Sequence, residues 1–338
     1  MTSYETAGVN LNAADELLDR IGWRVTSTWT EDVVGGFGGF AAGIQIPAGF
    51  EHPVLMMSTD GVGTKAELAR QAGMVEGLGY DLVAMVADDL AAAGAQPIAM
   101  TDYIAMGRLD VDRIEVIVES ITDACNEADI SLLGGETAEH PGVMPPDQFD
   151  IAATALGVVE LGEEIDATLV SPGDVIVGVK SPNPRSNGFS LVRAIVAKSL
   201  PLDSTFPDTD RPTAEVLLDP SIIYSPAVMN MLARVRPHGL AHITGGGLPG
   251  NVIRVLPEGS RAVIERSRWE VPHVFDVIGR LGEIPLGDMF RTFNMGIGFT
   301  CVVAEEDTDA TLKAFETSDL EASAIGHIVA GDRGVELR

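Results

Sequence analysis

A strand that leads directly into a glycine-containing loop and a lysine is the feature that most restricts the fold of this chain. The apolar stretch Pro53–Ser58 is followed by residues 59–65 (TDGVGTK), and Lys65 stands where a helix is predicted to begin. Gly61 and Gly63 let the backbone come close to a ligand, and the exposed amide groups of a helix N-terminus favour an anion. The segment therefore predicts a strand–loop–helix unit with an anion site. A tight turn with an exposed lysine is the alternative.

This loop differs from the P-loop of many nucleotide-binding proteins. Its glycine spacing is different and the Gly-Lys-Ser/Thr ending is missing, so a phosphate site of another kind is expected. Lys65 is one of only four lysines in the chain, and it would add a full positive charge to that site. Asp60 beside a bound phosphate would suit Mg²⁺, which takes one or two carboxylates together with phosphate oxygens.

Apolar stretches and amphipathic helix patterns occur along both halves of the chain. Asn12 and Asp110 are predicted helix N-caps, and the acidic stretch Gly162–Gly173 is the predicted boundary between domains 1–165 and 166–338. Mixed strands and helices in two halves predict a two-domain α/β or α+β protein. Further strands are predicted at 97–106, 130–133, 151–159, 175–179, 262–265, 296–303 and 322–329, and helices at 12–21, 80–93, 110 onward and 189–198.

The net charge excludes one class of partner. The chain has 50 acidic and 22 basic residues and a net charge of −28, so nucleic acid is not expected as a partner. Hydrophobic residues make up 46% of the chain, which argues against disorder. An acidic, lysine-poor surface suggests adaptation to high salt. At molar ionic strength the screening length falls to roughly 3 Å, which weakens repulsion between like charges.

The sequence indicates neither secretion nor a membrane segment. No apolar stretch reaches the roughly 18 residues of a membrane-spanning helix, and the N-terminus lacks the basic and apolar regions of a signal peptide. A cytoplasmic protein is therefore expected. Cys125 and Cys301 lie in a helix pattern and a strand pattern, and both are predicted to be buried free thiols.

Two further regions are candidates for nucleotide or structural roles. Residues 35–42 formally contain G-x-G-x-x-A, but no strand leads into them, so a dinucleotide-binding fold is not expected. A glycine loop that covers a nucleotide and a plain linker both remain open for this stretch. His242 precedes the glycine cluster 245–247, and a structural histidine is the more common case.

Three carboxylates from separate stretches are candidate metal ligands. Asp88 and Asp89 lie among apolar residues of a predicted helix, where a charge needs a partner or a metal, although paired acids are usually a solvated face. Glu136 follows two glycines at a predicted strand end, a common place for a functional side chain. Asp60, Asp89 and Glu136 together would suit a magnesium–triphosphate site.

Nine short motifs, in this order and spacing, resemble the phosphoribosylformylglycinamidine cyclo-ligase family, also called aminoimidazole ribonucleotide synthetases. Each motif is weak alone, whereas the full set over nearly the whole chain is specific. They are residues 4–9 (YETAGV), 35–40 (GGFGGF), 59–65 (TDGVGTK), 88–97 (DDLAAAGAQP), 109–111 (LDV), 134–142 (GGETAEHPG), 186–193 (SNGFSLVR), 242–247 (HITGGG) and 291–298 (RTFNMGIG).

The resemblance implies a fold and a reaction. It implies an N-terminal α/β domain whose four-stranded sheet forms a barrel across a homodimer, followed by a C-terminal α/β domain. The implied reaction uses ATP and Mg²⁺ to close the ring of formylglycinamidine ribonucleotide in de novo purine synthesis, giving 5-aminoimidazole ribonucleotide, ADP and phosphate. ATP would phosphorylate the formyl oxygen, and the amidine nitrogen would then displace the phosphate.

The resemblance also implies roles for individual residues. Asp60, Lys65 and Arg185 are the implied catalytic residues, and Asp60, Asp89 and Glu136 the implied metal ligands. The implied ATP-binding residues are Gly36, Gly38, Gly39, Asp60, Gly61, Gly63, Thr64, Lys65, Asp89, Gly135 and Glu136. The implied substrate-binding residues are Arg185, Ser186, Asn187, Gly188, Thr244, Gly245 and Gly246.

One position departs from the family pattern. The family usually has histidine just before the Ser-Asn-Gly turn, and this chain has Arg185. Arginine does not titrate near neutrality and cannot replace an acid–base histidine, but it can bind a substrate phosphate.

Related enzymes that transfer phosphate to amides, selenide or a thiamin phosphate share the architecture and are the alternative. The selenium enzyme usually has an N-terminal Cys and the hydrogenase-maturation protein a C-terminal one, and both are missing here. A dimer that only binds a nucleotide is the alternative from another class. It would be expected to lose Asp60, Asp89 and Glu136, which are all present.

Overall fold

The computed structural model of the protein describes residues 11–338, so the motif at Tyr4–Val9 lies outside the described residues. The chain forms two compact units. Unit 1 contains residues up to 90 together with 96–161 and 220–223. Unit 2 contains residues 91–95, 162–219 and 224–338. The chain therefore enters unit 1 a last time, for four residues, in the middle of unit 2.

Unit 1 is built on a four-stranded sheet in the order β3-β6-β4-β5. The strands are β3 (Pro53–Gly61), β4 (Gln96–Met106), β5 (Ser131–Glu139) and β6 (Phe149–Glu160). Strand β6 pairs antiparallel with both β3 and β4, and β4 pairs parallel with β5. Strands β3 and β5 are thus the two edges of the sheet.

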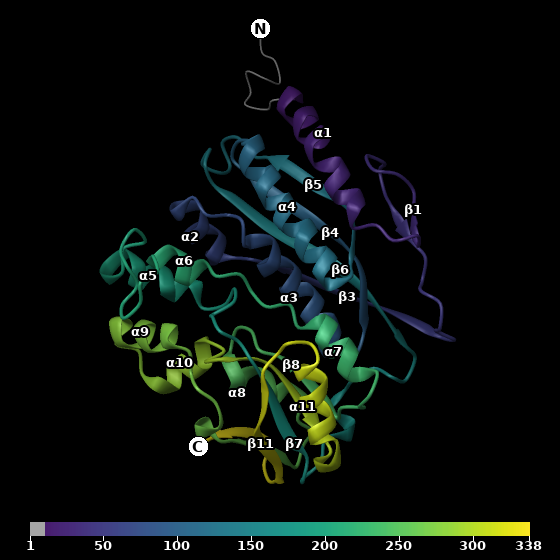
Figure 1. The fold of residues 1–338 in the computed structure, drawn as a ribbon, viewed down its shortest axis with the longest axis vertical. Helices are drawn as coiled ribbons and strands as arrows, with labels where there is room; N and C mark the ends of the chain where they lie inside the picture. Colours follow the sequence, from purple (N-terminus) through teal and green to yellow (C-terminus); the bar gives the residue numbers. More distant parts are fainter. Residues whose placement is uncertain (1–10) are drawn as a thin grey trace. The chain divides into compact units, whose positions relative to one another are not determined.

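Helices cover one face of this sheet, as Figure 1 shows for α3 and α4. The helices of unit 1 are α1 (Leu11–Ser27), α2 (Thr64–Ala72), α3 (Leu78–Ala92) and α4 (Val111–Ala128). On the other face, Leu55, Met57 and Tyr103 are 51%, 70% and 43% exposed. Side chains alternate between the faces of a sheet, so this open face is a row of apolar and hydroxyl side chains without a helix above it.

A short hairpin precedes the sheet. Strands β1 (Val33–Val34) and β2 (Gly43–Ile44) pair antiparallel, and the glycine-rich residues 35–42 form the connection between them. A short strand does lead into the stretch, contrary to the sequence prediction, but a second strand and not a helix follows it, so the stretch is a hairpin loop.

Unit 2 is built on a six-stranded sheet in the order β12-β9-β11-β7-β10-β8. All neighbours pair antiparallel except β12 and β9, which pair parallel. The strands are β7 (Val175–Lys180), β8 (Gly239–His242), β9 (Ser260–Ile264), β10 (Ile297–Val303), β11 (Ala322–Ala330) and β12 (Gly334–Leu337). Strand β10 is buried along its whole length, as expected for a central strand with an uninterrupted apolar run.

Seven α-helices and four short 3-10 helices complete the described part of unit 2. The α-helices are α5 (Phe189–Ser199), α6 (Thr213–Leu218), α7 (Ser225–Leu232), α8 (Gly247–Val252), α9 (His273–Gly282), α10 (Leu286–Thr292) and α11 (Thr308–Glu316). The 3-10 helices are η1 (Ala167–Leu169), η2 (Ile253–Val255), η3 (Arg266–Arg268) and η4 (Glu305–Asp307). Helix α11 packs against β7 and β11 and also contacts α7.

The mixed α/β class and most predicted elements are confirmed, with three errors. Strand β3 does not end at Ser58 but includes Asp60 and ends at Gly61. Asn12 is not a helix N-cap, because α1 already includes Leu11, and the helix continues to Ser27. Strand β5 does not end at Gly134 but continues to Glu139. Asp110 does cap α4, since its side chain accepts a hydrogen bond from the Arg113 amide at 3.2 Å.

Candidate functional site

The loop between β3 and α2 has the predicted strand–loop–helix form. Strand β3 ends at Gly61, where an added Cβ would lie 2.9 Å from the Ile151 carbonyl oxygen, so a larger residue would push the two strands apart. Gly63 is the N-cap of α2 and has φ 66°, ψ −141°, a conformation that favours glycine. Thr64 and Lys65 are the first residues of the helix. The helix N-terminus therefore follows directly on Asp60 and the sheet edge.

Lys65 has a different environment from the one expected. Its ammonium group lies 2.8 and 2.7 Å from the two carboxylate oxygens of Asp81 on α3, and the two side chains are 1% and 0% exposed. Asp81 also accepts hydrogen bonds from the Ser221 hydroxyl at 2.6 Å and the Ser221 amide at 3.1 Å. Burial raises the pKa of Asp81, and the Lys65 ammonium and the Ser221 donors oppose that shift. The charge of Lys65 thus lies beneath the loop and not on its surface.

Two of the candidate carboxylates lie at the same edge of the sheet. Asp60 is on β3, and its carboxylate accepts a hydrogen bond from the Gly61 amide at 2.7 Å. Asp89 on α3 is exposed and accepts a hydrogen bond from the hydroxyl of Ser58 at 3.2 Å. Ser58 and Asp60 are two positions apart on one strand, about 7 Å, and therefore point to the same side. Asp88, by contrast, is buried.

Glu136 lies at the opposite edge of the same sheet. Gly61 pairs with Ala152 of β6, Ala152 with Tyr103 of β4, and Tyr103 with Glu136 of β5. Three strand spacings separate the two edges, about 14 Å. Within residues 11–338 no three His, Cys, Asp or Glu side chains are grouped closely enough to hold a metal ion. The structure therefore does not gather Asp60, Asp89 and Glu136 around one point of a single chain.

A cavity of about 510 Å³ lies along β5 in unit 1. Apolar residues of α1 form one wall, and Gly135, Glu136 and Asp102 belong to another. Phe37 of the glycine-rich hairpin loop also lines this cavity. The structure thus brings the hairpin loop and the Gly135–Glu136 segment together, two of the regions implied to bind ATP. The glycines Gly36, Gly38 and Gly39 are exposed in this loop, and Gly38 has φ 82°.

Asp102 is a functional candidate that the sequence reasoning missed. It lies on β4 opposite Gly135, and burial raises the pKa of its carboxyl to about 7. A Cβ on Gly135 would lie 1.5 Å from Oδ1 of Asp102 and 2.8 Å from its carbonyl oxygen. The second glycine of the GGETAEHPG motif is therefore required by the carboxylate of the neighbouring strand. A charged residue in the apolar run of β4 was the available signal.

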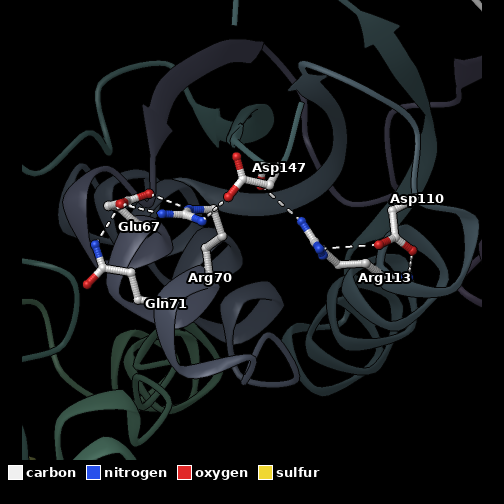
Figure 2. Close-up of polar contacts among 6 residues, drawn as sticks. All are labelled: Glu67, Arg70, Gln71, Asp110, Arg113 and Asp147. Carbon is white, nitrogen blue, oxygen red and sulfur yellow. Dashed lines mark hydrogen bonds and ion pairs between the residues drawn. The ribbon is translucent and has the colours of Figure 1, made fainter. Parts of the chain in front are cut away.

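The loop that follows β5 is fastened to two helices (Figure 2). The carboxylate of Asp147 pairs with Arg70 of α2, and its carbonyl oxygen accepts a hydrogen bond from Arg113 of α4 at 3.0 Å. Arg70 also donates to both carboxylate oxygens of Glu67, at 2.7 and 2.8 Å. These contacts hold α2, and with it the Asp60–Lys65 loop, to the loop after Glu136.

Arg185 of unit 2 is buried inside that unit. Its side chain lies 4.7 Å above the centre of the Tyr224 ring and donates to the Gly298 carbonyl oxygen at 3.4 Å. The residue is 1% exposed and has φ 58°, an unusual value outside glycine. Its amide donates to the side chain of Asn183 at 2.9 Å. A guanidinium over an aromatic ring is a stabilising arrangement, so part of the role of Arg185 is structural.

Three motifs of unit 2 meet at Phe293. A Cβ on Gly188 would lie 2.2 Å from the Phe293 ring, and one on Gly247 would lie 2.0 Å from the Phe290 carbonyl oxygen. Gly245 lies near the Asn187 side chain, which an added Cβ would meet at 3.7 Å. The implied substrate turn Ser186–Gly188 and the glycine cluster are therefore neighbours.

The loop that carries Thr244, Gly245 and Gly246 is held by one side chain. The amide of Asn251 on α8 donates to the carbonyl oxygens of Thr244 and Gly245, both at 3.3 Å, and of Gly247 at 2.9 Å. Gly246 and Gly247 have φ 97° and 60°. Asn251 thus fixes a backbone conformation that only glycines adopt easily.

Two further expectations concern the cysteines and the membrane. Cys125 and Cys301 are buried and free, as predicted. Burial raises the pKa of both thiols, which makes them poor nucleophiles. Over residues 11–338, none of the helices combines the length and the apolar character that crossing a bilayer would take.

Known proteins match the chain over almost its whole length. Residues 24–159 match the N-terminal domain of AIR synthase related proteins, and residues 171–337 match the C-terminal domain. The chain belongs to this family. It is 42% identical to the phosphoribosylformylglycinamidine cyclo-ligase of Myxococcus xanthus (strain DK1622), over 98% of this chain and 96% of that one. It is 44% identical to the same enzyme of Parasynechococcus marenigrum (strain WH8102), over 97% and 96% of the two chains.

Two solved structures of proteins with low sequence identity support the fold. A thiamine-monophosphate kinase from Stenotrophomonas maltophilia K279a superposes with a TM-score of 0.69 and 22% identity, over 95% of both chains. The hydrogenase maturation protein HypE in complex with ATP gives a TM-score of 0.70 at 19% identity, over 98% of this chain and 92% of that one. At these identities the likeness supports the AIR synthase related fold alone.

Proposed function

We infer that this protein is a phosphoribosylformylglycinamidine cyclo-ligase. The identity of 42–44% to curated enzymes of that name, over nearly the full length of both chains, carries the conclusion. The reaction would convert formylglycinamidine ribonucleotide and ATP to 5-aminoimidazole ribonucleotide, ADP and phosphate. The protein's main task in such a ring closure is to hold the amidine nitrogen next to the activated carbon, which can lower the barrier by roughly 7–11 kcal/mol.

The loop Asp60–Lys65 is proposed to receive the phosphates of ATP. Its amides and the start of α2 offer donors to an anion, and Asp60 and Asp89 lie at the same sheet edge. Two carboxylates fit Mg²⁺, which would complete its shell with phosphate oxygens and water and would neutralise charge on the transferring phosphoryl group. Lys65 would act from beneath the loop, where Asp81 holds it.

A homodimer is proposed to complete the site. In one chain Asp60 and Glu136 lie at opposite edges of the four-stranded sheet. If two copies close their sheets into a barrel, β3 of one copy approaches β5 of the other, and Glu136 can reach the Asp60 edge. The open face with Leu55 and Met57 would then become the barrel interior. Burying these side chains would favour association, at about 25 cal/mol per Å² of apolar surface.

The turn around Ser186–Gly188 and the loop Thr244–Gly246 are proposed to bind the ribonucleotide. Both are glycine-containing segments. Gly188 and Gly247 both lie against Phe293, and Asn251 fixes the backbone of the second segment. Backbone amides of this kind suit a phosphate or a sugar hydroxyl.

Activity is tested with the full-length protein, formylglycinamidine ribonucleotide and Mg-ATP in molar KCl, with aminoimidazole product and ADP both measured. Equal amounts of the two products are expected, and thiamin monophosphate serves as a control substrate that should not be phosphorylated. ADP release without aminoimidazole product, or phosphorylation of thiamin monophosphate, would reject the cyclo-ligase activity.

Site sharing between copies is tested by mixing two inactive variants, Asp60→Asn and Glu136→Gln. A random mixture contains one half mixed dimers, and each has one site with both native residues. A quarter of wild-type activity is therefore expected after subunit exchange. No recovery, with exchange shown independently by mass, would place both residues of a working site in the same chain.

A further inference from the structure

A short piece of the second half of the sequence is packed into unit 1 at the Lys65–Asp81 ion pair. Residues 220–223 belong to unit 1, whereas Asp219 and Tyr224 on either side of them belong to unit 2. Ser221 is 3% exposed and donates both its hydroxyl and its amide to the same Asp81 oxygen. Hydrogen bonds to a buried carboxylate are shorter and stronger than those between neutral groups, so this contact fixes the segment firmly.

Both ends of this segment contact the turn that carries Arg185. On one side, the Asn183 side-chain amide donates to the Asp219 carbonyl oxygen at 3.4 Å, and Asn183 in turn accepts from the Arg185 amide. On the other side, the Tyr224 ring lies beneath the Arg185 guanidinium, and the Tyr224 hydroxyl donates to the Lys180 carbonyl oxygen at 2.8 Å. Tyr224 is fully buried. The six residues Asp219–Tyr224, here called the strap, are thus anchored at both ends and in the middle.

We infer that the strap couples the Asp60–Lys65 loop to the Arg185 turn, with Asp81, Ser221 and Tyr224 as positioning residues. The inference rests on the proposed function, in which the loop receives ATP and the turn receives the ribonucleotide. Only two residues separate Ser221 from Tyr224, so a shift of the Arg185 turn is transmitted by covalent backbone to the Asp81 carboxylate. Lys65 is held by that carboxylate and lies in the first turn of α2, so the loop before it moves with it.

The chemistry gives this coupling a use. Transfer of the phosphoryl group from ATP to water, before the ribonucleotide is bound, would waste ATP. A loop that reaches its productive position only when the Arg185 turn is occupied would prevent this. The strap therefore predicts that the two ligands bind with positive cooperativity, and a coupling between two sites must act equally in both directions.

The test uses Ser221→Ala, which removes the hydroxyl and leaves the Lys65–Asp81 pair, and Ser221→Thr, which restores the hydroxyl. Ser120→Ala is the matched control: Ser120 is about equally buried in unit 1, lies on α4 and accepts one hydrogen bond, from the Gly79 amide at 3.0 Å. Binding of a non-hydrolysable ATP analogue is measured by calorimetry with and without ribonucleotide, together with both KM values and the melting temperature.

In the wild type, ribonucleotide is expected to tighten the nucleotide analogue several-fold. Ser221→Ala leaves only the amide donor of the strap to Asp81 and is expected to reduce this enhancement clearly and to raise both KM values about tenfold, the usual effect of losing a hydrogen bond to a charged group. Ser221→Thr should restore the enhancement. Ser120→Ala should lower the melting temperature but leave the enhancement unchanged. Equal enhancement in Ser221→Ala and Ser120→Ala would overturn the inference.

A second pair of variants keeps the test decisive if Ser221→Ala proves unstable. Tyr224→Leu removes the ring beneath Arg185 and should weaken nucleotide binding in the wild-type background but not in the Asp81→Asn background, where the carboxylate charge that holds Ser221 is already lost. Additive effects would contradict the coupling. A wild type that binds both ligands cooperatively but forms no aminoimidazole product would reject the proposed function but would still support the coupling through the strap.

Discussion

Replacing Asp102 by asparagine is expected to stabilise the protein at neutral and alkaline pH. The pKa of Asp102 is raised to about 7 by burial, whereas an aspartate in the unfolded chain titrates near 3.8. Below about pH 4 both states hold the proton, and the carboxyl costs nothing. Between about pH 4 and pH 7 the unfolded chain has lost this proton while the folded protein still holds it, so stability declines across this window, and the loss is complete above about pH 7.

The size of the effect follows from the shift. Three pKa units correspond to about 4 kcal/mol, since each unit is about 1.4 kcal/mol. Asp102 borders the cavity along β5 and retains some exposure, so solvent screens part of the charge. We therefore expect Asp102→Asn to gain about 1–3 kcal/mol at pH 8 and about half of that at pH 5.5.

The assay is thermal and urea unfolding of the full chain between pH 5.5 and 8.5 in constant KCl. Asp123→Asn is the matched control, because Asp123 is exposed on α4 and its replacement removes the same charge. A gain that is equal in the two variants, or that does not grow with pH, would refute the account of Asp102.

Three further outcomes are expected. Gly135→Ala should destabilise unit 1 by several kcal/mol at any pH, because its Cβ would overlap the Asp102 carboxylate, and unfolding in urea measures this. Arg185→Ala should raise the KM for the ribonucleotide more than it lowers kcat and should also lower the melting temperature, since the contact with Tyr224 is lost; a pure kcat effect would contradict this. The melting temperature should rise between 0.1 and about 2 M KCl because a net charge of −28 repels itself, and an unchanged value would argue against adaptation to salt.

Local patterns in the sequence were sufficient to predict most helices and strands and the loop before α2. The strand that begins at Pro53 and the lysine at the helix start follow from residues next to one another, although the strand was predicted to end at Ser58 and ends at Gly61. The course of β5 was not predictable in this way. Two consecutive glycines normally end a strand, but here the pairing with β4 continues through them, and the Asp102 carboxylate of β4 takes the place that a side chain on Gly135 would fill.

The partners of Lys65 could not be predicted from local sequence patterns either. Asp81 is 16 residues away and Ser221 is 140 residues beyond Asp81, so no local pattern joins them. The rule that a charge among apolar residues needs a partner was applied to Asp88 and Asp89 and would have selected Asp81 as well. The separation of Asp60 and Glu136 also required the strand order, because motif spacing does not reveal which strands lie at the edges.

The return of residues 220–223 to unit 1 limits how the gene can be divided. A fragment that stops near residue 165 would keep Lys65 and Asp81 but lack both donors from Ser221. A chimera joined at the border between the two family domains would place one parent's Asp81 against the other parent's Ser221. Recombination there should succeed mainly between parents that agree at these positions, so the two halves of the gene are expected to evolve as one.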